Sequence, residues 1–241
     1  MDAAAFFAAV RAQPFGGTLP QKAVDGLTAI LKGWSLFGDG DLRKLAYILA
    51  TAFHEADRFR TMEEYASGAA YEGRKDLGNT QTGDGKRFKG RGFVQITGRR
   101  NYADWSERTG YDLVRLPEMA AEPALAARIL VEGSLLGTFT GKKLGDYITA
   151  AKADYTSARR VINGTDKAAL IAGYAAKFEA ALKAAGYGVA PAPLPDILDG
   201  AKPEPTPEPD DRAARLAEFD AAFAAANEAF VTLRLARERL L

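Results

Sequence analysis

Apolar residues recur every three or four positions through most of the first 188 residues, which is the spacing of amphipathic helices. The clearest run begins at Asp41, a residue type that suits a helix N-cap, and continues to about Phe59 with an apolar stripe that reaches Ala56. Glycine and polar residues dominate from Gly68 to Gly92, as is typical of a long loop. The pattern predicts helices over residues 3–12, 21–32, 41–59, 100–109, 121–137, 142–160 and 166–185.

Residues 93–97 (FVQIT) are the best candidate for a strand, because the segment is short, contains β-branched residues and is bounded by glycines. We therefore expect a mainly α domain over residues 1–188 with at most a small β-hairpin or sheet. Residues 189–211 are rich in proline and predict a stiff linker.

Residues 212–241 have one uninterrupted helical pattern with an apolar seam at alternating spacings of three and four. An amphipathic helix with exposed phenylalanines needs a partner in water. The seam fits self-association, contact with a partner protein or membrane surface, or packing on the first domain, and the sequence leaves these alternatives open.

The composition removes several kinds of chemistry. The chain has no cysteine and a single histidine, His54, so thiolate nucleophiles and cysteine-ligated metals are excluded. In the string HEADR, Arg58 occupies the place where a zinc helix would have its second histidine. We expect no metal or cofactor, and carboxylates are the remaining acid–base groups. A formal net charge of +1 gives no reason to expect nucleic acid as a partner.

The N-terminus lacks the basic region of a secretory signal, and no apolar stretch approaches the ~20 residues of a membrane span. The sequence therefore predicts a protein made in the cytoplasm without a transmembrane segment. A basic cluster could bind an anionic polymer or form a solvated rim; it comprises Lys86, Arg87, Lys89, Arg91, Arg99 and Arg100.

Four acidic residues lie within positions 53–65, and two of them suit paired acid–base work. Glu55 lies at the margin of the apolar stripe, where partial desolvation favours the neutral carboxyl that a general acid needs. The alternative is a glutamate at the edge of a helix without chemical role. Glu64 follows nine residues later, and an unbroken helix would place it ~13.5 Å further along the axis. The carboxyls of a glycosidase lie ~5–9.5 Å apart, so the pair works only if the helix ends near Phe59 and the chain turns back.

Three strings, HEADRFRTMEEY, GDGKRFKGRGFVQITGRRNY and RRVINGTDKAAL, occur in this order over residues 54–170. Together they resemble glycoside hydrolase family 19, in particular the bacteriophage and prophage endolysins related to plant-type chitinases. The resemblance covers roughly residues 1–187 and implies a lysozyme-like helical domain with a cleft between two lobes. It also implies hydrolysis of β-1,4 glycosidic bonds with inversion by two glutamates.

By the same resemblance, Glu55 is the general acid and Glu64 the general base, with Glu63 its competitor. Thr97 belongs to the catalytic set, and the remaining motif positions are expected to bind substrate: His54, Arg91, Gln95, Asn101, Tyr102 and Asn163. The chain departs from the family pattern at Ala56, Thr165 and the segment YASGAAYEG that follows Glu64.

The leading functional hypothesis is a peptidoglycan hydrolase, an endolysin that reaches the bacterial cell wall after release through a separate pore-forming protein. A chitinase and a lytic transglycosylase are the alternatives within the enzyme class. A non-catalytic glycan-binding module on a degenerate hydrolase fold is the alternative outside it.

Overall fold

The computed structural model describes residues 1–188 and the isolated positions 217 and 221. The predicted linker and C-terminal helix therefore lie outside the described residues, apart from those two positions. Eight α-helices occur in the described part: α1 (Ala3–Ala12), α2 (Gln21–Phe37), α3 (Leu42–Glu55), α4 (Asp84–Arg87), α5 (Arg99–Thr109), α6 (Pro123–Leu136), α7 (Tyr155–Ala158) and α8 (Ala168–Ala184). Short 3-10 helices connect them: η1 (Ala69–Tyr71), η2 (Lys75–Leu77), η3 (Pro117–Ala121), η4 (Leu144–Asp146) and η5 (Arg159–Val161).

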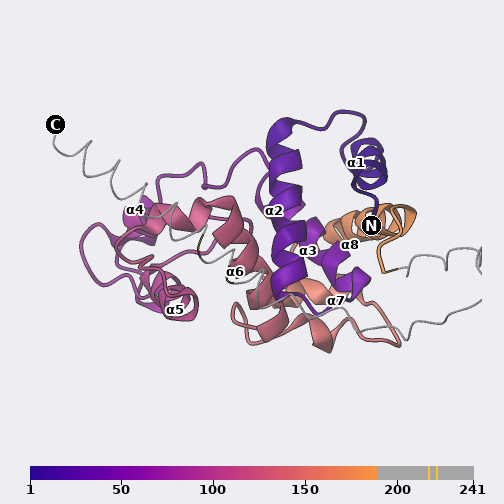
Figure 1. Cartoon of the computed structure of the whole chain (residues 1–241). Coiled ribbons are helices and arrows are strands. Elements are labelled where there is room, and N and C mark those ends of the chain that lie inside the picture. Colours follow the sequence, from indigo (N-terminus) through magenta and orange to yellow (C-terminus); the bar gives the residue numbers. More distant parts are fainter. Residues whose placement is uncertain (189–216, 218–220, 222–241) are drawn as a thin grey trace, which may run out of the picture. The chain divides into compact units, whose positions relative to one another are not determined.

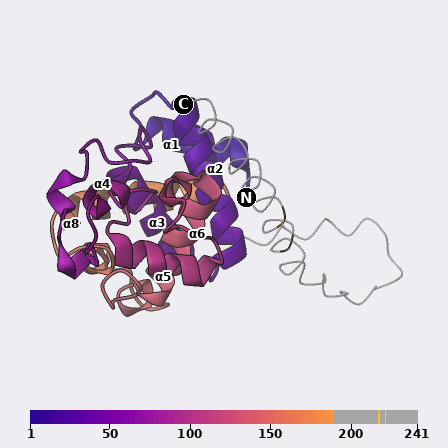
Figure 2. The ribbon, with the colours of Figure 1, turned by 90° about the vertical axis from the view of Figure 1, so that its left-hand side faces the viewer.

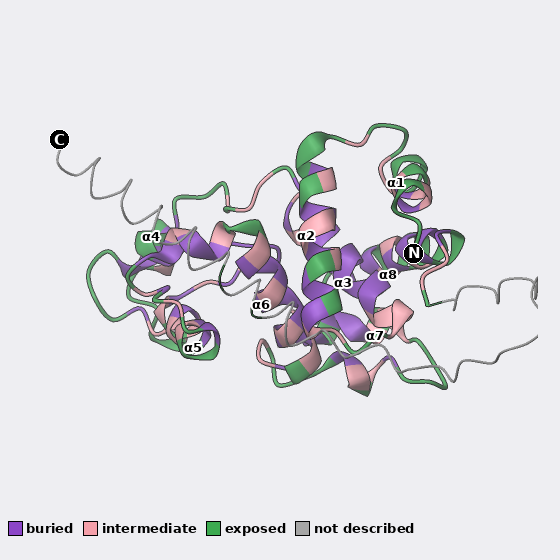
Figure 3. Ribbon diagram, in the orientation of Figure 1, coloured by how far each residue is buried: buried purple, intermediate pink, exposed green. Residues whose placement is uncertain are grey.

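Helix α3 lies in the middle of the domain, with α1 and α8 on one side and α4 and α5 on the other (Figure 1). Figure 2 views the domain from the side of α4 and α5. It packs most extensively against α8, and α2 packs against α6. Asp41 caps α3 as predicted, because its carboxylate accepts the backbone N–H of Arg43 at 2.8 Å. Every residue from Leu45 to Phe53 is buried, so the central helix is covered on all sides rather than along a stripe (Figure 3).

The predicted strand over residues 93–97 is wrong. Gly92 and Gln95 have positive φ angles of 80° and 55°, and these turn the chain back within a few residues. Arg91 and Ile96 exchange both backbone hydrogen bonds, at 3.2 and 3.0 Å, and so close a tight hairpin. The β-branched residues that suggested a strand, Val94 and Ile96, are buried in this turn. In the described residues β-pairing is limited to isolated bridges, which confirms a mainly α fold with at most a small hairpin.

The long helix predicted over residues 142–160 is also wrong. The segment contains only η4, α7 and η5, with a bridge between Ile148 and Ala153 in the middle. Asp154 starts a new helix there, because its carboxylate accepts the N–H of Ser157 at 2.9 Å. This break matters for the site, because it places η5 beside the C-terminal end of α3.

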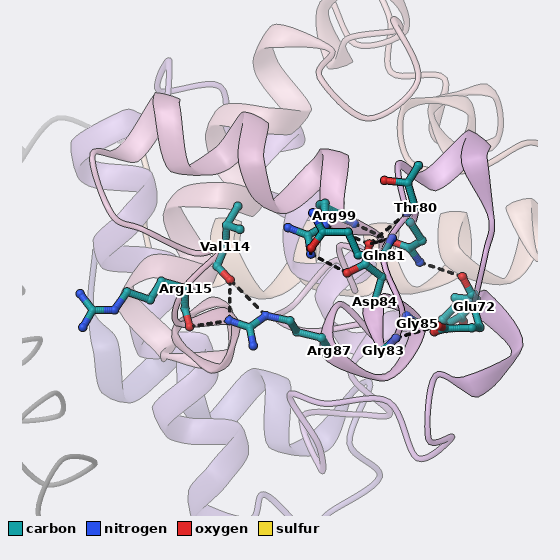
Figure 4. Close-up of polar contacts among 12 residues, drawn as sticks. Glu72, Thr80, Gln81, Gly83, Asp84, Gly85, Arg87, Arg99, Val114 and Arg115 are labelled. Carbon is teal, nitrogen blue, oxygen red and sulfur yellow. Dashed lines mark hydrogen bonds and ion pairs between the residues drawn. The ribbon is translucent and has the colours of Figure 1, made fainter. Parts of the chain in front are cut away.

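The polar loop from Gly68 to Gly92 is organised by two carboxylates, the buried one of Asp84 and the exposed one of Glu72, rather than by an apolar core (Figure 4). Asp84 is 1% exposed and accepts hydrogen bonds from two Arg99 nitrogens, at 2.6 and 2.9 Å, and from the backbone N–H groups of Thr80 and Gln81. The Glu72 carboxylate accepts the N–H groups of Gly83 and Gly85 at 2.7 and 2.8 Å.

Several side chains of the predicted basic cluster make hydrogen bonds and ion pairs within the protein. Arg99 pairs with Asp84, and Arg87 donates to the carbonyl groups of Val114 and Arg115. Arg91 is buried and pairs with Glu63. Lys89 lies 3.5 Å from the same Glu63 carboxylate, so four of the six cationic side chains make internal contacts.

The Asp84–Arg99 pair predicts a pH-dependent stability. The hydrogen-bonded Arg99 guanidinium lowers the pKa of Asp84 below its usual value of 3.8. A carboxyl with a lowered pKa in the folded protein adds stability that is present above its unfolded pKa and is lost as pH falls through the folded one. We expect Asp84→Asn to reduce the free energy of unfolding by about 3 kcal/mol at pH 7, because a buried charge loses its partner. The difference from the parent protein should shrink below about pH 4.

Urea unfolding of both proteins between pH 2 and 7 measures this difference. Asp76→Asn is the matched control, because Asp76 pairs with Arg74 in the same loop but has a side chain that is 62% exposed. An exposed pair contributes little, so this variant should unfold almost like the parent. Equal losses in the two variants would contradict the role of burial.

Candidate active site

The chain reverses direction directly after α3. The helix ends at Glu55, four residues earlier than the pattern predicted, and Asp57, Arg58 and Phe59 follow with φ angles of 44°, 57° and 66°. Three consecutive non-glycine residues in the left-handed region are costly, and such strain persists only where the surroundings impose it. The helix therefore ends before Glu64 and the left-handed residues change the direction of the chain, as a pair of facing glutamates requires.

Packing of Phe59 holds this reversal in place. Its ring is 3% exposed and lies 5.8 Å from the ring of Phe93 and 6.3 Å from that of Phe15, measured between centroids. Gly26 on α2 makes room for it, since a methyl group there would lie 2.5 Å from the Phe59 ring. Burial of an aromatic side chain offsets the cost of the backbone strain.

The segment after the reversal pairs with the GRG motif. Glu64 donates its N–H to the carbonyl of Gly90 at 3.0 Å, and Gly92 donates to that of Met62 at 2.8 Å. Glu63 and Arg91 form an isolated antiparallel bridge. Successive side chains of extended backbone point to opposite sides, so Glu63 and Glu64 face different surroundings.

Glu63 lies against two cations. Its Oε1 accepts a hydrogen bond from Arg91 Nε at 2.9 Å and lies 3.5 Å from Lys89 Nζ. Glu63 also borders a pocket of about 350 Å³ whose floor includes Phe59, Met62 and Phe93. Its carboxylate is thus engaged by the protein.

Glu64 lies in a polar cluster centred on Gly90. Its Oε2 accepts the N–H of Gly90 at 2.7 Å. A methyl group on Gly90 would lie 2.7 Å from Glu64 Oε2, 2.9 Å from Gln95 Oε1 and 3.3 Å from Thr97 Oγ1. The absence of a side chain at Gly90 therefore lets three predicted site residues converge on one point.

Tyr71 joins this cluster, although sequence reasoning missed it. Burial raises the pKa of Tyr71, and the charge of Glu64 and a hydrogen bond to its carboxylate raise it further. Tyr71 lies on η1, in the segment where the chain departs from the family pattern. A short 3-10 helix inside a glycine-rich loop has no periodicity by which the sequence could have indicated it.

Glu55 has a different neighbour from the one predicted. The sequence suggested an apolar flank, but Oε1 of Glu55 accepts a hydrogen bond from Arg159 Nη1 at 2.5 Å. Arg159 is 3% exposed and donates its Nε to the carbonyl of Asp166 at 2.9 Å. A guanidinium held at two points fixes Oε1 of Glu55, whereas Oε2 makes no hydrogen bond with any of the described residues.

Arg159 is the second residue that sequence reasoning missed. It lies in the string RRVINGTDKAAL, which was used for the resemblance, but nothing local distinguishes it from Arg160. Only the packing of η5 beside α3 shows which arginine is buried. Tyr47 lies on the same row of α3 as Glu55, and burial raises the pKa of its hydroxyl. The charge of Arg159 lowers this pKa and that of Glu55 raises it.

Two of the predicted substrate-binding residues are buried supports in this structure. Tyr102 is fully buried, donates its hydroxyl to the carbonyl of Lys89 at 2.7 Å and accepts a hydrogen bond from Arg91 Nη1 at 3.0 Å. Because it is buried, Tyr102 cannot contact a ligand directly in this structure. The Arg91 guanidinium donates hydrogen bonds to Glu63, to the Tyr102 hydroxyl and to the carbonyl of Arg87. The pair holds the segment that carries Gly90.

The other predicted residues are more accessible. Asn101 donates its amide to the backbone carbonyl of Thr97 at 2.7 Å, and so supports the segment that carries Thr97. Asn163 is exposed, and its backbone N–H donates to the carbonyl of Arg159 at 3.0 Å, so it follows the residue that contacts Glu55 by one helical turn. His54 is partly exposed at the end of α3. The site thus consists of two polar clusters joined by the reversal between Glu55 and Glu64.

No group of three histidine or acidic side chains suited to a metal ion occurs within the described part of the chain. Among the helices that the structure describes, none has the length and apolar character needed to cross a membrane.

Comparisons with known proteins relate the chain to glycoside hydrolase family 19. No protein-family model matches it. A stretch of 58 residues, 24% of the chain, is 34% identical to a glycosyl hydrolase family 19 domain-containing protein of Haemophilus influenzae. This match spans 29% of that relative, so less than a third of its length is covered.

Two solved structures are similar to the described domain. Chitinase C from Streptomyces griseus superposes with a TM-score of 0.52 and 20% identity over 78% of each chain. A bacterial family 19 chitinase gives a TM-score of 0.44 and 20% identity over 70% of this chain and 88% of that one. The first likeness shows that the chain has a chitinase-like glycosidase fold.

Proposed function

We propose that the chain is a family 19-like glycoside hydrolase that cleaves β-1,4 bonds of bacterial peptidoglycan by inverting acid–base catalysis. The observation that carries this proposal is the convergence of Glu64, Gln95 and Thr97 at Gly90, next to a strained reversal that begins at Glu55. Strained backbone and polar side chains gathered around one point are typical of functional sites.

In this mechanism Glu55 is the general acid. In the free protein Glu55 is paired with Arg159 through Oε1; in the substrate complex, where the sugar displaces water, Oε2 takes up the proton and delivers it to the leaving glycosidic oxygen. The buried guanidinium stabilises the carboxylate that forms once the proton has left. Arg159 is therefore a positioning residue for Glu55.

Glu64 is the general base that activates a water on the opposite face of the sugar. It suits this role better than Glu63, because Glu63 is engaged by Arg91 and Lys89. The Gly90 N–H orients one carboxylate oxygen of Glu64.

Thr97 and Gln95 position the reacting groups. Both project from the tight hairpin that replaces the predicted strand, and the positive φ of Gln95 directs its side chain toward Gly90. A hydroxyl and an amide next to the base can orient a water or the acetamide of an N-acetylated sugar. The water is kept in line for attack because a rigid turn supports both groups.

Peptidoglycan is proposed as the substrate because the motifs resemble those of endolysins, which act on the cell wall after release from the cytoplasm. Chitin is the second candidate, favoured by the likeness to the Streptomyces griseus chitinase. Both polymers are β-1,4-linked chains of N-acetylated sugars, so the same two glutamates serve either.

Mass spectrometry of digests separates these functions. Purified sacculi and chitin oligomers are incubated with the protein, and the new reducing-end sugar is identified. We expect reducing muropeptides from sacculi, released as the α-anomer in an NMR time course if the reaction inverts. Cleavage of chitin alone would identify chitin, and not peptidoglycan, as the substrate. Products with a 1,6-anhydro sugar would show that the reaction is a transglycosylation and not a hydrolysis. Retention on sacculi without any new reducing end would identify a binding module.

A further inference from the structure

Tyr65 has an exposed aromatic ring directly after the proposed base. It is 77% exposed, the most exposed of the large apolar side chains in the described residues, followed by Leu136 at 63%. Single apolar side chains on a surface are common, so exposure alone carries no inference. The position next to Glu64 and the contact of its hydroxyl distinguish Tyr65.

The Tyr65 hydroxyl is fixed across the reversal. It donates to Asp57 Oδ2 at 3.0 Å, and the same carboxylate oxygen lies 3.5 Å from Arg60 Nη1. Asp57 lies two residues after Glu55, and Tyr65 one residue after Glu64. The hydrogen bond therefore joins the two ends of the loop that separates the proposed acid from the proposed base.

We propose that Tyr65 is a platform on which a pyranose ring of the substrate stacks, in a subsite bordered by the loop from Asp57 to Tyr65. This inference rests on the proposed function and adds a substrate-binding residue to it. One face of a β-1,4-linked pyranose carries only C–H groups, and an aromatic ring offers a flat surface that covers them. The sugar face that stacks is apolar, whereas its hydroxyl and acetamide edges stay open to polar side chains.

The hydrogen bond between the Tyr65 hydroxyl and Asp57 orders the ring for binding. A tyrosine has only two side-chain torsions, and the bond to Asp57 restricts them before the sugar arrives. A ring ordered in advance loses less conformational entropy on binding, so more of the contact energy appears as affinity. The resemblance assigns no role to this position, which follows Glu64 in the segment that departs from the family pattern.

Calorimetric binding of a chitin hexamer and of soluble peptidoglycan glycan strands tests the proposal in the Glu55→Gln background. Tyr65→Ala should raise the dissociation constant about tenfold, because the stacking surface is lost. Tyr65→Phe keeps the ring and loses only the hydrogen bond to Asp57, so it should raise the dissociation constant about threefold or less. Leu136→Ala removes another exposed apolar side chain, at the end of α6, and should bind like the parent.

In the otherwise native protein, Tyr65→Ala should raise KM about tenfold and leave kcat within about twofold, since uniform binding is lost. Thermal unfolding should be unchanged, because the side chain is exposed. Unaltered binding by Tyr65→Ala, or a loss equal to that of Tyr65→Phe, would overturn the platform while leaving the proposed hydrolase intact. Failure of the parent to bind or cleave either glycan would overturn both.

Discussion

Replacing Glu55 with glutamine should reduce kcat on the preferred glycan by about 10²–10⁴-fold, because an amide cannot give a proton to the leaving oxygen. The amide oxygen still accepts a hydrogen bond from Arg159, so the variant should fold. Its melting temperature should fall, since a buried guanidinium loses its counter-charge. Release of reducing ends measures the activity, and circular dichroism the fold.

Glu55→Asp separates the loss of the acid from the loss of the ion pair. It keeps a charge for Arg159 and shortens the reach of the carboxyl by one methylene group. We expect a melting temperature closer to that of the parent and an activity still reduced about 10²-fold, because a proton donor displaced by about 1 Å is poorly placed. Full activity of Glu55→Gln would remove Glu55 from the mechanism.

Gly90→Ala should reduce kcat/KM about 10²-fold without unfolding the protein. The added methyl group would lie 2.7 Å from Glu64 Oε2, 2.9 Å from Gln95 Oε1 and 3.3 Å from Thr97 Oγ1, so all three side chains must move. Displacement of groups that orient a water by a fraction of an ångström to 1 Å is costly for catalysis. Steady-state kinetics on a soluble glycan oligomer measures the effect.

Gly145→Ala is the matched control for this substitution. Gly145 lies in η4 with nothing within 4 Å of the position that a methyl group would take. The control should therefore keep the activity of the parent within about twofold, as expected for a surface change that touches nothing. Equal activity of Gly90→Ala and Gly145→Ala would show that the convergence at Gly90 has no part in catalysis.

Much of the central scaffold could be predicted from local pattern. The Asp41 cap, the apolar run of α3 and the helices α1, α5, α6 and α8 follow from spacing and capping, and the structure confirms them to within a few residues. The segment 93–97 was mispredicted, because β-branched residues also suit a buried turn. The run over 142–160 was mispredicted, because helical spacing alone does not reveal the cap at Asp154.

The roles of the two adjacent acids, Glu63 and Glu64, could not be separated in the sequence. They are neighbours with the same chemistry, and only the pairing of their segment with Gly90–Gly92 turns them to opposite sides. The burial of Tyr102 and Arg91 could not be predicted either. A motif identifies a residue but does not indicate whether its side chain contacts the ligand or supports another residue that does.

By itself, the sequence determined that the domain is mainly helical, that carboxylates are the acid–base groups available in a chain without cysteine and with one histidine, and that its motifs resemble those of family 19. These properties depend on periodicity, composition and short strings, which are local. Only the tertiary structure decided where α3 ends, since three left-handed residues persist because Phe59 is packed against distant rings. It also brought Arg159 to Glu55 across 104 positions of sequence, a contact that depends on packing between helices and leaves no trace in local spacing.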